Sequence, residues 1–322
     1  MSVVIERTLR QFWLPGINAI TGKLDRGIQA FLLDEKYRIY DSPTDKIFVV
    51  TPFEPNELKK SVCHDLSRMA SASFESINSI APVDAFDKSC AWSAIRAYYA
   101  AFFSAHAILR IFGTSCTQLD QPHISYIAKV AMYSNSKSVM PIQGLYKCEW
   151  DEIKGTLAFN HIGGSHETVW LEFSKTLLSL HNKLLQPSAV GLITDLQEAA
   201  TDLNKMRDEL STGGFNGGNW LSAIRNRINY RHDFSLWHPY GKKPDYYQAI
   251  WAVASGRWLR SPIPVKAIPV HGREIEKLME LSGSIVALCR ILIEHIDETC
   301  IYGKSFVNFG PKSYIDKLKI LP

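Results

Sequence analysis

Apolar residues recur along most of this chain at steps of three and four, the spacing of an amphipathic helix. The clearest case runs from about Ser89 to Gly113, where Trp92, Ile95 and Tyr99 begin a stripe that widens to most of the helix circumference. A helix that is apolar nearly all round lies in the middle of a bundle. Gly113 suits the left-handed cap that ends such a helix.

The same periodicity predicts seven further helices. They are expected at Asn56–Ser76, His123–Tyr133, His166–Leu185, Leu192–Leu210, Trp220–Phe234, Tyr246–Leu259 and Arg273–Thr299. Two short runs, Lys36–Tyr40 and Lys46–Val50, flank a proline-containing turn and predict a β-hairpin. Three prolines favour an extended segment over 261–270. We therefore expect a mainly α fold, a helical bundle with a small N-terminal α+β region that contains the hairpin.

The length of 322 residues, with 46% hydrophobic and 21% charged residues, is typical of a soluble globular protein. We divide the chain into an N-terminal region of mixed helix and hairpin (1–85), a helical domain with insertions (86–300) and a C-terminal tail (301–322). The glycine-rich stretch 213–218 is the clearest flexible joint, and Asn219 after it is a candidate N-cap.

Cysteine usage and hydropathy predict a cytoplasmic protein that does not enter a membrane. The six cysteines are scattered without a C-x-x-C pair, which favours reduced thiols. Three charged side chains within the first sixteen residues argue against a secretion leader. The most apolar long stretch, 92–112, contains Arg96, His106 and Arg110, so we interpret it as a core helix.

The net charge of +4 is unevenly distributed. Between Trp220 and Arg273 nine Lys and Arg residues accompany two Asp, so this segment carries +7 and the remainder −3. Nine aromatic residues are interleaved with these cations. Because basic groups hold phosphates and aromatic faces stack on bases, the composition favours a surface for single-stranded nucleic acid. The alternative is a solvated basic rim over an aromatic core.

Familiar metal and nucleotide motifs do not fit the chain. Gly16 to Lys23 imitates a phosphate-binding loop, but five residues separate its glycines and Leu24 replaces the Ser or Thr that binds magnesium. His166 begins a zinc-protease pattern, but Trp170 stands where the second histidine belongs. We therefore expect no metal and no cofactor.

One predicted helix carries a set of side chains suited to RNA cleavage. At about 100° per residue, Arg225 and His232 fall within about 20° of each other, and Asn229 lies close to the same face. The imidazole can take a proton from a ribose 2′-hydroxyl or give one to the leaving oxygen, and the guanidinium can stabilise the charged phosphorane. Such chemistry requires no metal.

This segment resembles the HEPN superfamily, whose signature is an Arg, a polar residue, and a His after four to six intervening positions. Arg225 with Asn226 fits with six positions before His232. Arg227 fits with four, but Ile228 occupies the polar position, so Arg225 is preferred.

A second stretch, R-A-Y-Y-A-A-F-F-S-A-H-A-I-L from Arg96 to Leu109, resembles the R-x-Y-Y-A first helix of many bacterial HEPN proteins. Together the two motifs span about residues 89–236. This separation exceeds that of a minimal HEPN domain, so insertions are expected around Thr114–Ser165.

The resemblance implies a helical bundle that forms a homodimer, with two Arg/His pairs in one cleft. It also implies metal-independent endoribonuclease activity, often within prokaryotic toxin–antitoxin or antiphage defence systems, with an antitoxin or defence protein as partner. Phe234 stands where one antitoxin-modified branch has tyrosine, so silencing through that hydroxyl is not expected.

These arguments define three groups of candidate site residues. The catalytic candidates are Arg225, Asn226 and His232; the supporting or alternative residues are Arg227, Asn229, Tyr230 and Arg96; the RNA-binding candidates are Arg231, Lys242 and Lys243. Each has an ordinary structural interpretation. His232 could cap its helix, Tyr230 could be packing, and Arg96 could be a buried cation paired with an acid.

Three functions remain open at this point. The first is a dimeric enzyme that cleaves single-stranded RNA at the Arg225–His232 pair. The second is a non-catalytic helical module that binds RNA, a nucleotide or a partner protein. The third is a regulatory subunit of a defence complex in which region 1–85 docks a partner.

Overall fold

The computed structural model describes residues 4–40, 43–80, 90–134, 140–164, 166–231, 233–237, 257–260 and 274–320. The helices are α1 (Ile5–Leu9), α2 (Ile28–Leu33), α3 (Pro55–Asn78), α4 (Cys90–Ile111), α5 (Gln121–Tyr133), α6 (His166–Leu184), α7 (Ile193–Leu210), α8 (Trp220–Asn226), α10 (Arg257–Arg260), α11 (Glu274–Glu298) and α12 (Pro311–Ile320). The strands are β1 (Tyr37–Tyr40), β2 (Ile47–Pro52), β3 (Thr114–Leu119), β4 (Gly144–Asp151) and β5 (Thr156–Gly163). Short 3₁₀ turns lie at Arg10–Phe12, Ile17–Ala19, Thr212–Gly214 and Phe306–Phe309, and a π-helical turn at Arg227–Arg231.

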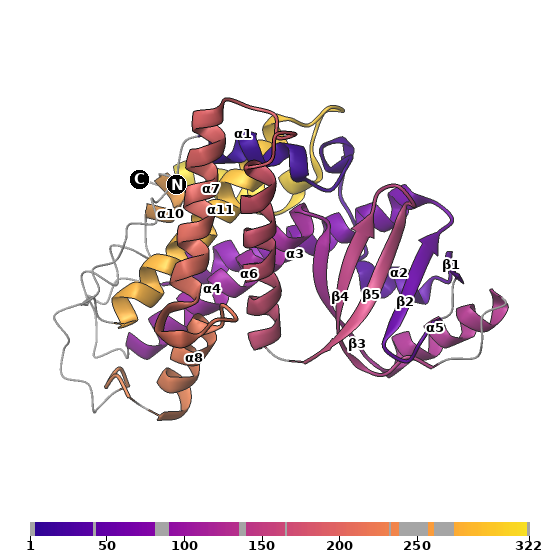
Figure 1. The fold of residues 1–322 in the computed structure, drawn as a ribbon, viewed down its shortest axis with the longest axis horizontal. Helices are drawn as coiled ribbons and strands as arrows, with labels where there is room; N and C mark the ends of the chain where they lie inside the picture. Colours follow the sequence, from indigo (N-terminus) through magenta and orange to yellow (C-terminus); the bar gives the residue numbers. More distant parts are fainter. Residues whose placement is uncertain are drawn as a thin grey trace.

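The helix α4 occupies the centre of the molecule, as its nearly continuous apolar surface predicts (Figure 1). It contacts α3, α6, α8, α11 and the strand β3. Gly113 follows it with a φ of 73°, the left-handed conformation that ends the helix and that glycine adopts without steric cost. The prediction of a central core helix with a glycine cap is therefore confirmed.

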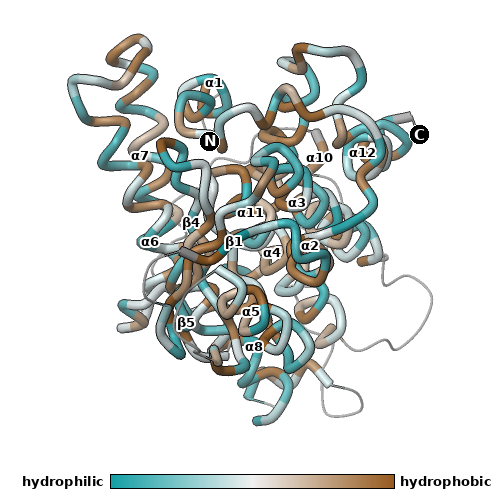
Figure 2. The backbone as a smooth tube through the Cα atoms, turned by 90° about the vertical axis from the view of Figure 1, so that its right-hand side faces the viewer, coloured by the Kyte–Doolittle hydropathy of each residue, from teal (hydrophilic) through white to brown (hydrophobic). Residues whose placement is uncertain are grey.

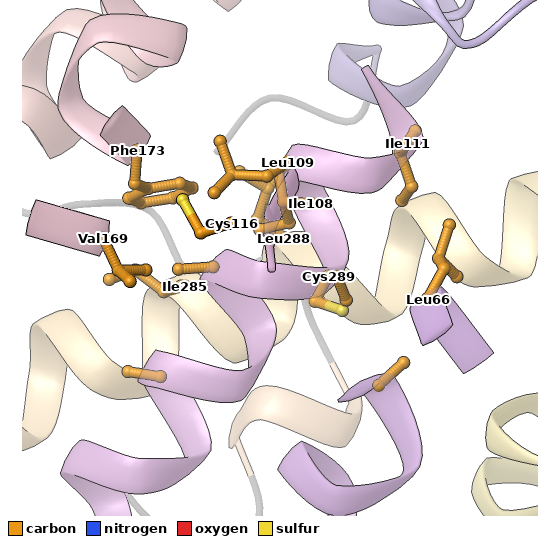
Figure 3. Packing of buried hydrophobic residues seen from close by; sticks show 14 of the residues in the cluster. Leu66, Ile108, Leu109, Ile111, Cys116, Val169, Phe173, Ile285, Leu288 and Cys289 are labelled. Atoms are coloured by element: carbon orange, nitrogen blue, oxygen red, sulfur yellow. The ribbon is translucent and has the colours of Figure 1, made fainter. Parts of the chain in front are cut away.

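Side chains from four helices and one strand meet around α4 (Figure 3). They include Leu66 of α3, Ile108 and Leu109 of α4, Cys116 of β3, Val169 and Phe173 of α6, and Ile285 and Leu288 of α11. All of these side chains are at most 3% exposed. Burial of so much apolar surface is the main source of the fold's stability.

A five-stranded antiparallel sheet stands against the helices, in the order β1-β2-β5-β4-β3 (Figure 1). The predicted hairpin is confirmed as β1 and β2, with Tyr37 opposite Pro52. The other three strands fall within 114–163, where the sequence analysis expected only insertions into a helical domain. The prediction of a mainly α bundle with a single hairpin is wrong, because the chain has an α+β fold.

The missed strands have a physical reason. β3 reads Thr-Ser-Cys-Thr-Gln-Leu, and its Ser115 and Thr117 are buried and hydrogen-bonded to each other at 3.2 Å. A polar strand of this kind lacks the alternating apolar signal on which strand prediction depends. The central pairing also joins distant segments, since Phe48 of β2 stacks on Phe159 of β5 at 4.7 Å between ring centroids.

Most of the helix predictions are confirmed to within about three residues at each end. This holds for α3, α4, α5, α6, α7 and α11. The helix predicted over Trp220–Phe234 is confirmed in part, because α8 covers Trp220–Asn226 and a π-helical turn continues it over Arg227–Arg231. Asn219 precedes α8 but makes no side-chain cap bond. Of the helix predicted at Tyr246–Leu259, 246–256 lie outside the described residues, as does the predicted extended segment 261–270.

The three predicted segments share one hydrophobic core. β2 from the 1–85 region pairs with β5 from the 86–300 region, and α12 from the tail packs against α3. The helix α5 contacts β1 at one edge of the sheet, α2 contacts β3 at the other, and the two helices contact each other. The helix α7 alternates hydrophilic and hydrophobic residues along its length (Figure 2), which matches its position at the surface against α6.

No helix within the described ranges combines the length and the apolar character needed to cross a membrane.

Candidate functional site

The arginine of the predicted pair lies on α8, which packs beside α4 and α6 (Figure 1). Most side chains of this short helix are buried, and Arg225 is half-buried on its last turn. Its guanidinium Nη1 donates to Asn226 Oδ1 at 2.8 Å, and Nη2 donates to the Tyr99 hydroxyl at 2.5 Å. The two motifs that the sequence analysis treated separately therefore meet at this hydrogen bond.

Two tyrosine rings surround the Arg225 guanidinium. Its central carbon lies 5.7 Å from the ring centroid of Tyr98 and 5.5 Å from that of Tyr99, within cation–π range. Burial lowers the pKa of Arg225, but the hydrogen bond to Tyr99 and the neighbouring tyrosine hydroxyls raise the pKa further than burial lowers it. Arg225 Nε is buried and has no partner among the described residues. The result is a permanently charged guanidinium held in one orientation.

A histidine that the sequence analysis did not select stands next to this arginine. His166, the first residue of α6, has its ring stacked on Phe102 with 4.3 Å between centroids. Its Nδ1 lies 2.8 Å from the Tyr98 hydroxyl. Burial lowers the pKa of His166, and the charge of Arg225 lowers it further. The imidazole is therefore neutral at neutral pH and is available to accept a proton.

The Tyr98 hydroxyl links His166 to the neighbouring Trp170. Trp170 Nε1 donates to this hydroxyl at 3.2 Å, and the same hydroxyl is hydrogen-bonded to His166 Nδ1. Burial raises the pKa of Tyr98 to about 12, so its hydroxyl stays protonated.

Arg227, the second candidate for the arginine of the motif, forms ion pairs with two acidic residues. Its Nε donates to Asp233 at 2.9 Å and its Nη1 to Glu274 at 2.7 Å. The hydrogen bond to Asp233 is the largest cause of the raised pKa of Arg227. The guanidinium also lies 4.5 Å from the ring centroid of Phe234. Arg227 therefore ties the π-helical turn to α11, and Arg225 is the better placed of the two for a ligand.

The other predicted residues divide into exposed and structural positions. Tyr230 is 72% exposed, so the interpretation of it as a packing residue is wrong. Arg231 is exposed beside it, and Asn229 is half-buried. Arg96 is also exposed, and its Nη1 donates to the Ser79 carbonyl at 2.6 Å at the end of α3. The prediction of a buried cation paired with an acid is therefore wrong for Arg96.

The predicted shared face of Arg225 and His232 requires a regular α-helix beyond Asn226, where α8 ends. The α-helix ends at Asn226, and Arg227–Arg231 form a π-helical turn with i to i+5 hydrogen bonding. Each residue of a π-helical turn advances by less than the about 100° of an α-helix, so the regular α-helical spacing assumed for this segment does not hold over Arg227–Arg231. His232, Lys242 and Lys243 lie outside the described residues.

Across the described part of the chain, no group of three or more His, Cys, Asp and Glu side chains is arranged to hold a metal ion. The arrangement around Arg225 is instead that of a fixed cation, a neutral imidazole and two tyrosine hydroxyls. These groups can bind a phosphate and move a proton near it.

The sequence analysis missed His166 for an identifiable reason. It considered this residue only as part of a zinc motif and dropped it when the motif failed. Tyr99 belongs to the apolar stripe of the predicted core helix, yet it is only half-buried, and its ring and that of Tyr98 both contact Arg225. A histidine at the first position of a helix, directly after two glycines and a serine, is the local signal that was available.

Comparison with protein-family models, curated proteins and solved structures finds no match to this chain.

Proposed function

We propose that this protein binds single-stranded RNA at Arg225 and cleaves it without a metal ion. The observation that carries the proposal is the guanidinium of Arg225, fixed by Tyr99 and Asn226 with a neutral His166 beside it. A charged guanidinium that is held in one orientation is suited to bind a phosphodiester oxygen. The exposed Tyr230 and Arg231 next to it supply a stacking ring and a second cation.

The proposed reaction balances with groups of this chain. A histidine removes the proton of the ribose 2′-hydroxyl, and the 2′-oxygen attacks the adjacent phosphorus. Arg225 stabilises the phosphorane charge, the bond from phosphorus to the 5′-oxygen breaks, and that oxygen takes up a proton. The products are a 2′,3′-cyclic phosphate and a 5′-hydroxyl. His232 is the acid–base residue that the motif supports, and His166 is the one that the contacts of Arg225 support.

The biological setting follows from the resemblance to the HEPN superfamily. On that basis we propose a homodimer with a composite site, acting in a prokaryotic toxin or antiphage defence system with an antitoxin or defence protein as partner. We also propose a cytoplasmic location, since all six cysteines are free and a reducing compartment keeps them so.

The test is cleavage of a 5′-labelled single-stranded RNA by the purified protein in EDTA. We expect the wild-type protein to cleave this RNA. We expect an RNA with 2′-deoxy positions to stay intact, because the attacking hydroxyl is missing. Arg225→Met is expected to lower the rate at least about 100-fold, the usual cost of removing one transition-state donor. His232→Ala and His166→Gln decide which histidine transfers the proton, and His181→Gln on the same helix as His166 is the matched control.

Equal cleavage by wild type and Arg225→Met, or by wild type and both histidine variants, would contradict the proposal. RNA binding without cleavage by wild type would favour the second candidate, a non-catalytic module that binds RNA, a nucleotide or a partner protein. The π-helical turn at Arg227–Arg231 favours that candidate, because the catalytic motif was inferred from the spacing of a regular α-helix.

A further inference from the structure

A pocket of about 320 Å³ opens on the other side of His166, between α3, α4, β3 and the start of α6. Its walls are of two kinds. The apolar wall includes Met69, Leu145 and Val169, and the polar wall includes Arg68 and Arg110. A volume at the lower end of the range for ligand sites, with polar and charged groups beside apolar side chains, suits a small amphipathic molecule.

Arg110 is the unusual residue of this pocket. It is only 2% exposed, and within the described ranges no carboxylate lies within ion-pair distance of it. Its Nη1 donates to the His106 carbonyl at 2.8 Å and lies 3.4 Å from the His106 Nδ1, and its Nη2 donates to the Cys116 carbonyl at 3.5 Å. Its Nε is buried with no partner among the described residues. Burial of this cation is unfavourable and the more distant charge of Asp65 offsets only part of it, so a bound anion would stabilise Arg110 further.

The one acidic residue that lines the pocket is already engaged. Asp65 Oδ2 accepts the backbone N–H of Ile28 at 3.1 Å. Its Oδ1 lies 3.8 Å from Arg68 and 3.5 Å from His64. Counting Arg68 and Arg110 against Asp65 leaves one net positive charge on the pocket lining. The two histidines on the lining add no charge at neutral pH: burial and the charge of Arg110 hold the pKa of His106 well below its usual range, and burial lowers the pKa of His166.

The apolar wall determines what such an anion must carry. Met69 and Leu145 present aliphatic surface, and Phe102 presents a ring that is stacked on His166. An inorganic ion would leave this surface in contact with water. A ring attached to the anionic group would cover it and gain the hydrophobic contribution of the buried area.

We propose that this pocket binds a small ring-bearing organic anion, with its carboxylate or phosphate on Arg110 and Arg68 and its ring against Met69, Leu145 and Phe102. This pocket does not include Arg225, although His166 borders both it and the proposed RNA site. It would make the protein a receptor for a small acid beside its RNA-binding surface.

The test is isothermal titration of the full chain with four probes. Benzoate and phenyl phosphate carry a ring and a charge, benzamide is the neutral counterpart of benzoate, and inorganic phosphate has no ring. We expect benzoate or phenyl phosphate to bind with a Kd on the order of 0.1–1 mM. Benzamide and inorganic phosphate are each expected to bind at least about tenfold more weakly, since each lacks one of the two contributions. The ratio of benzoate to phenyl phosphate affinity distinguishes a carboxylate ligand from a phosphate ligand.

Three arginine variants complete the test. Arg110→Met is expected to abolish binding, and Arg68→Met, at a more exposed position, to weaken it about three- to tenfold. Arg207→Met on α7 is the matched control, because Arg207 lies 3.7 Å from Asp208 much as Arg68 lies from Asp65. Arg225→Met is expected to leave benzoate binding unchanged, which separates this proposal from the RNA proposal.

Several results would overturn the proposal: no binding of either charged ring compound at millimolar concentration, equal affinity for benzamide and benzoate, or unchanged affinity in Arg68→Met. If Arg110→Met does not fold, the Arg68→Met comparison and the benzamide comparison decide the question without it.

Discussion

At the scale of single residues, two arginines of this protein keep their charge in different ways. Arg225 is half-buried between tyrosine rings whose hydroxyls support its charge. Arg110 is fully buried and donates to two carbonyl oxygens, and burial lowers its pKa further than the charge of Asp65 raises it. Each arginine has a histidine next to it, and in both cases the positive charge adds to burial in keeping the imidazole neutral.

These neutral histidines predict a loss of stability in mild acid. The pKa of His106 is lowered well below 6.5 in the folded state, while the unfolded chain protonates its histidines near that value. Below pH 6.5 the unfolded state therefore binds more protons than the folded state, and the free energy of unfolding falls as the pH falls. His166 contributes in the same direction.

The measurement is urea unfolding of wild type and His106→Gln between about pH 7.5 and about pH 5. Wild type is expected to lose stability toward acid by at most about 1.4 kcal/mol per pH unit for each histidine, and His106→Gln to show a smaller slope. His181→Gln provides a matched substitution elsewhere. Equal slopes for wild type and His106→Gln would contradict the buried neutral state of His106.

At the scale of elements, the end of α4 shows how a backbone conformation places the sheet. Gly113 ends the helix with a φ of 73°, and its carbonyl accepts the N–H of Trp150 at 2.9 Å. The next residue begins β3, so this turn redirects the chain from the helix core into the sheet. The π-helical turn after α8 has a comparable role, since Arg227 and Trp237 fix it through hydrogen bonds to Glu274 and to the Ile228 carbonyl.

Gly113→Ala is expected to destabilise the protein by about 1–2 kcal/mol, the cost of a left-handed conformation for a residue with a Cβ. An added Cβ would meet Trp150 at 3.5 Å, an ordinary contact, so the cost arises from the backbone and not from a clash. Gly164→Ala is the control, because that glycine has no positive φ and open space around it.

Thermal or urea unfolding of the two variants checks this expectation. Gly164→Ala is expected to be neutral or stabilising by up to about 1 kcal/mol, through the lower entropy of the unfolded chain. A Gly113→Ala protein as stable as wild type would mean that the left-handed turn is not required at the end of α4.

At the scale of the whole molecule, the sheet joins parts of the chain that lie far apart in sequence. The hairpin of β1 and β2 is completed by strands that follow α4, and the tail helix α12 returns to pack on α3. Phe48 lies where the hairpin meets these later strands: its side chain is 1% exposed and contacts both Phe159 and Tyr146.

Phe48→Ala is therefore expected to destabilise the entire protein by about 3–5 kcal/mol, the usual cost of removing a buried ring. Far-ultraviolet circular dichroism and tryptophan fluorescence are expected to report one shared unfolding transition. Ile47→Ala, at the neighbouring and 50% exposed position, is the control and is expected to cost below about 1 kcal/mol. Separate transitions by the two probes would show that the sheet and the helices unfold independently.

The sequence by itself determined the local features of this protein. The boundaries of α3, α4, α6, α7 and α11 follow from apolar periodicity and caps, and the hairpin follows from two apolar runs around a turn. These are decided by interactions between residues close in sequence, so a pattern reveals them. The choice of Arg225 also came from sequence, through its spacing from His232.

Only the tertiary structure decided what these elements build. The strands β3, β4 and β5 pair with one another, but they join the predicted hairpin only because β5 pairs with the distant β2, where Phe159 stacks on Phe48, and no local period records that pairing. Arg225 acquires Tyr99 and a neutral His166 because α4, α6 and α8 pack together, although those residues are far apart in sequence. Burial and charge pairing depend on all neighbours in space at once, which is why the pocket around Arg110 could not be predicted from the sequence.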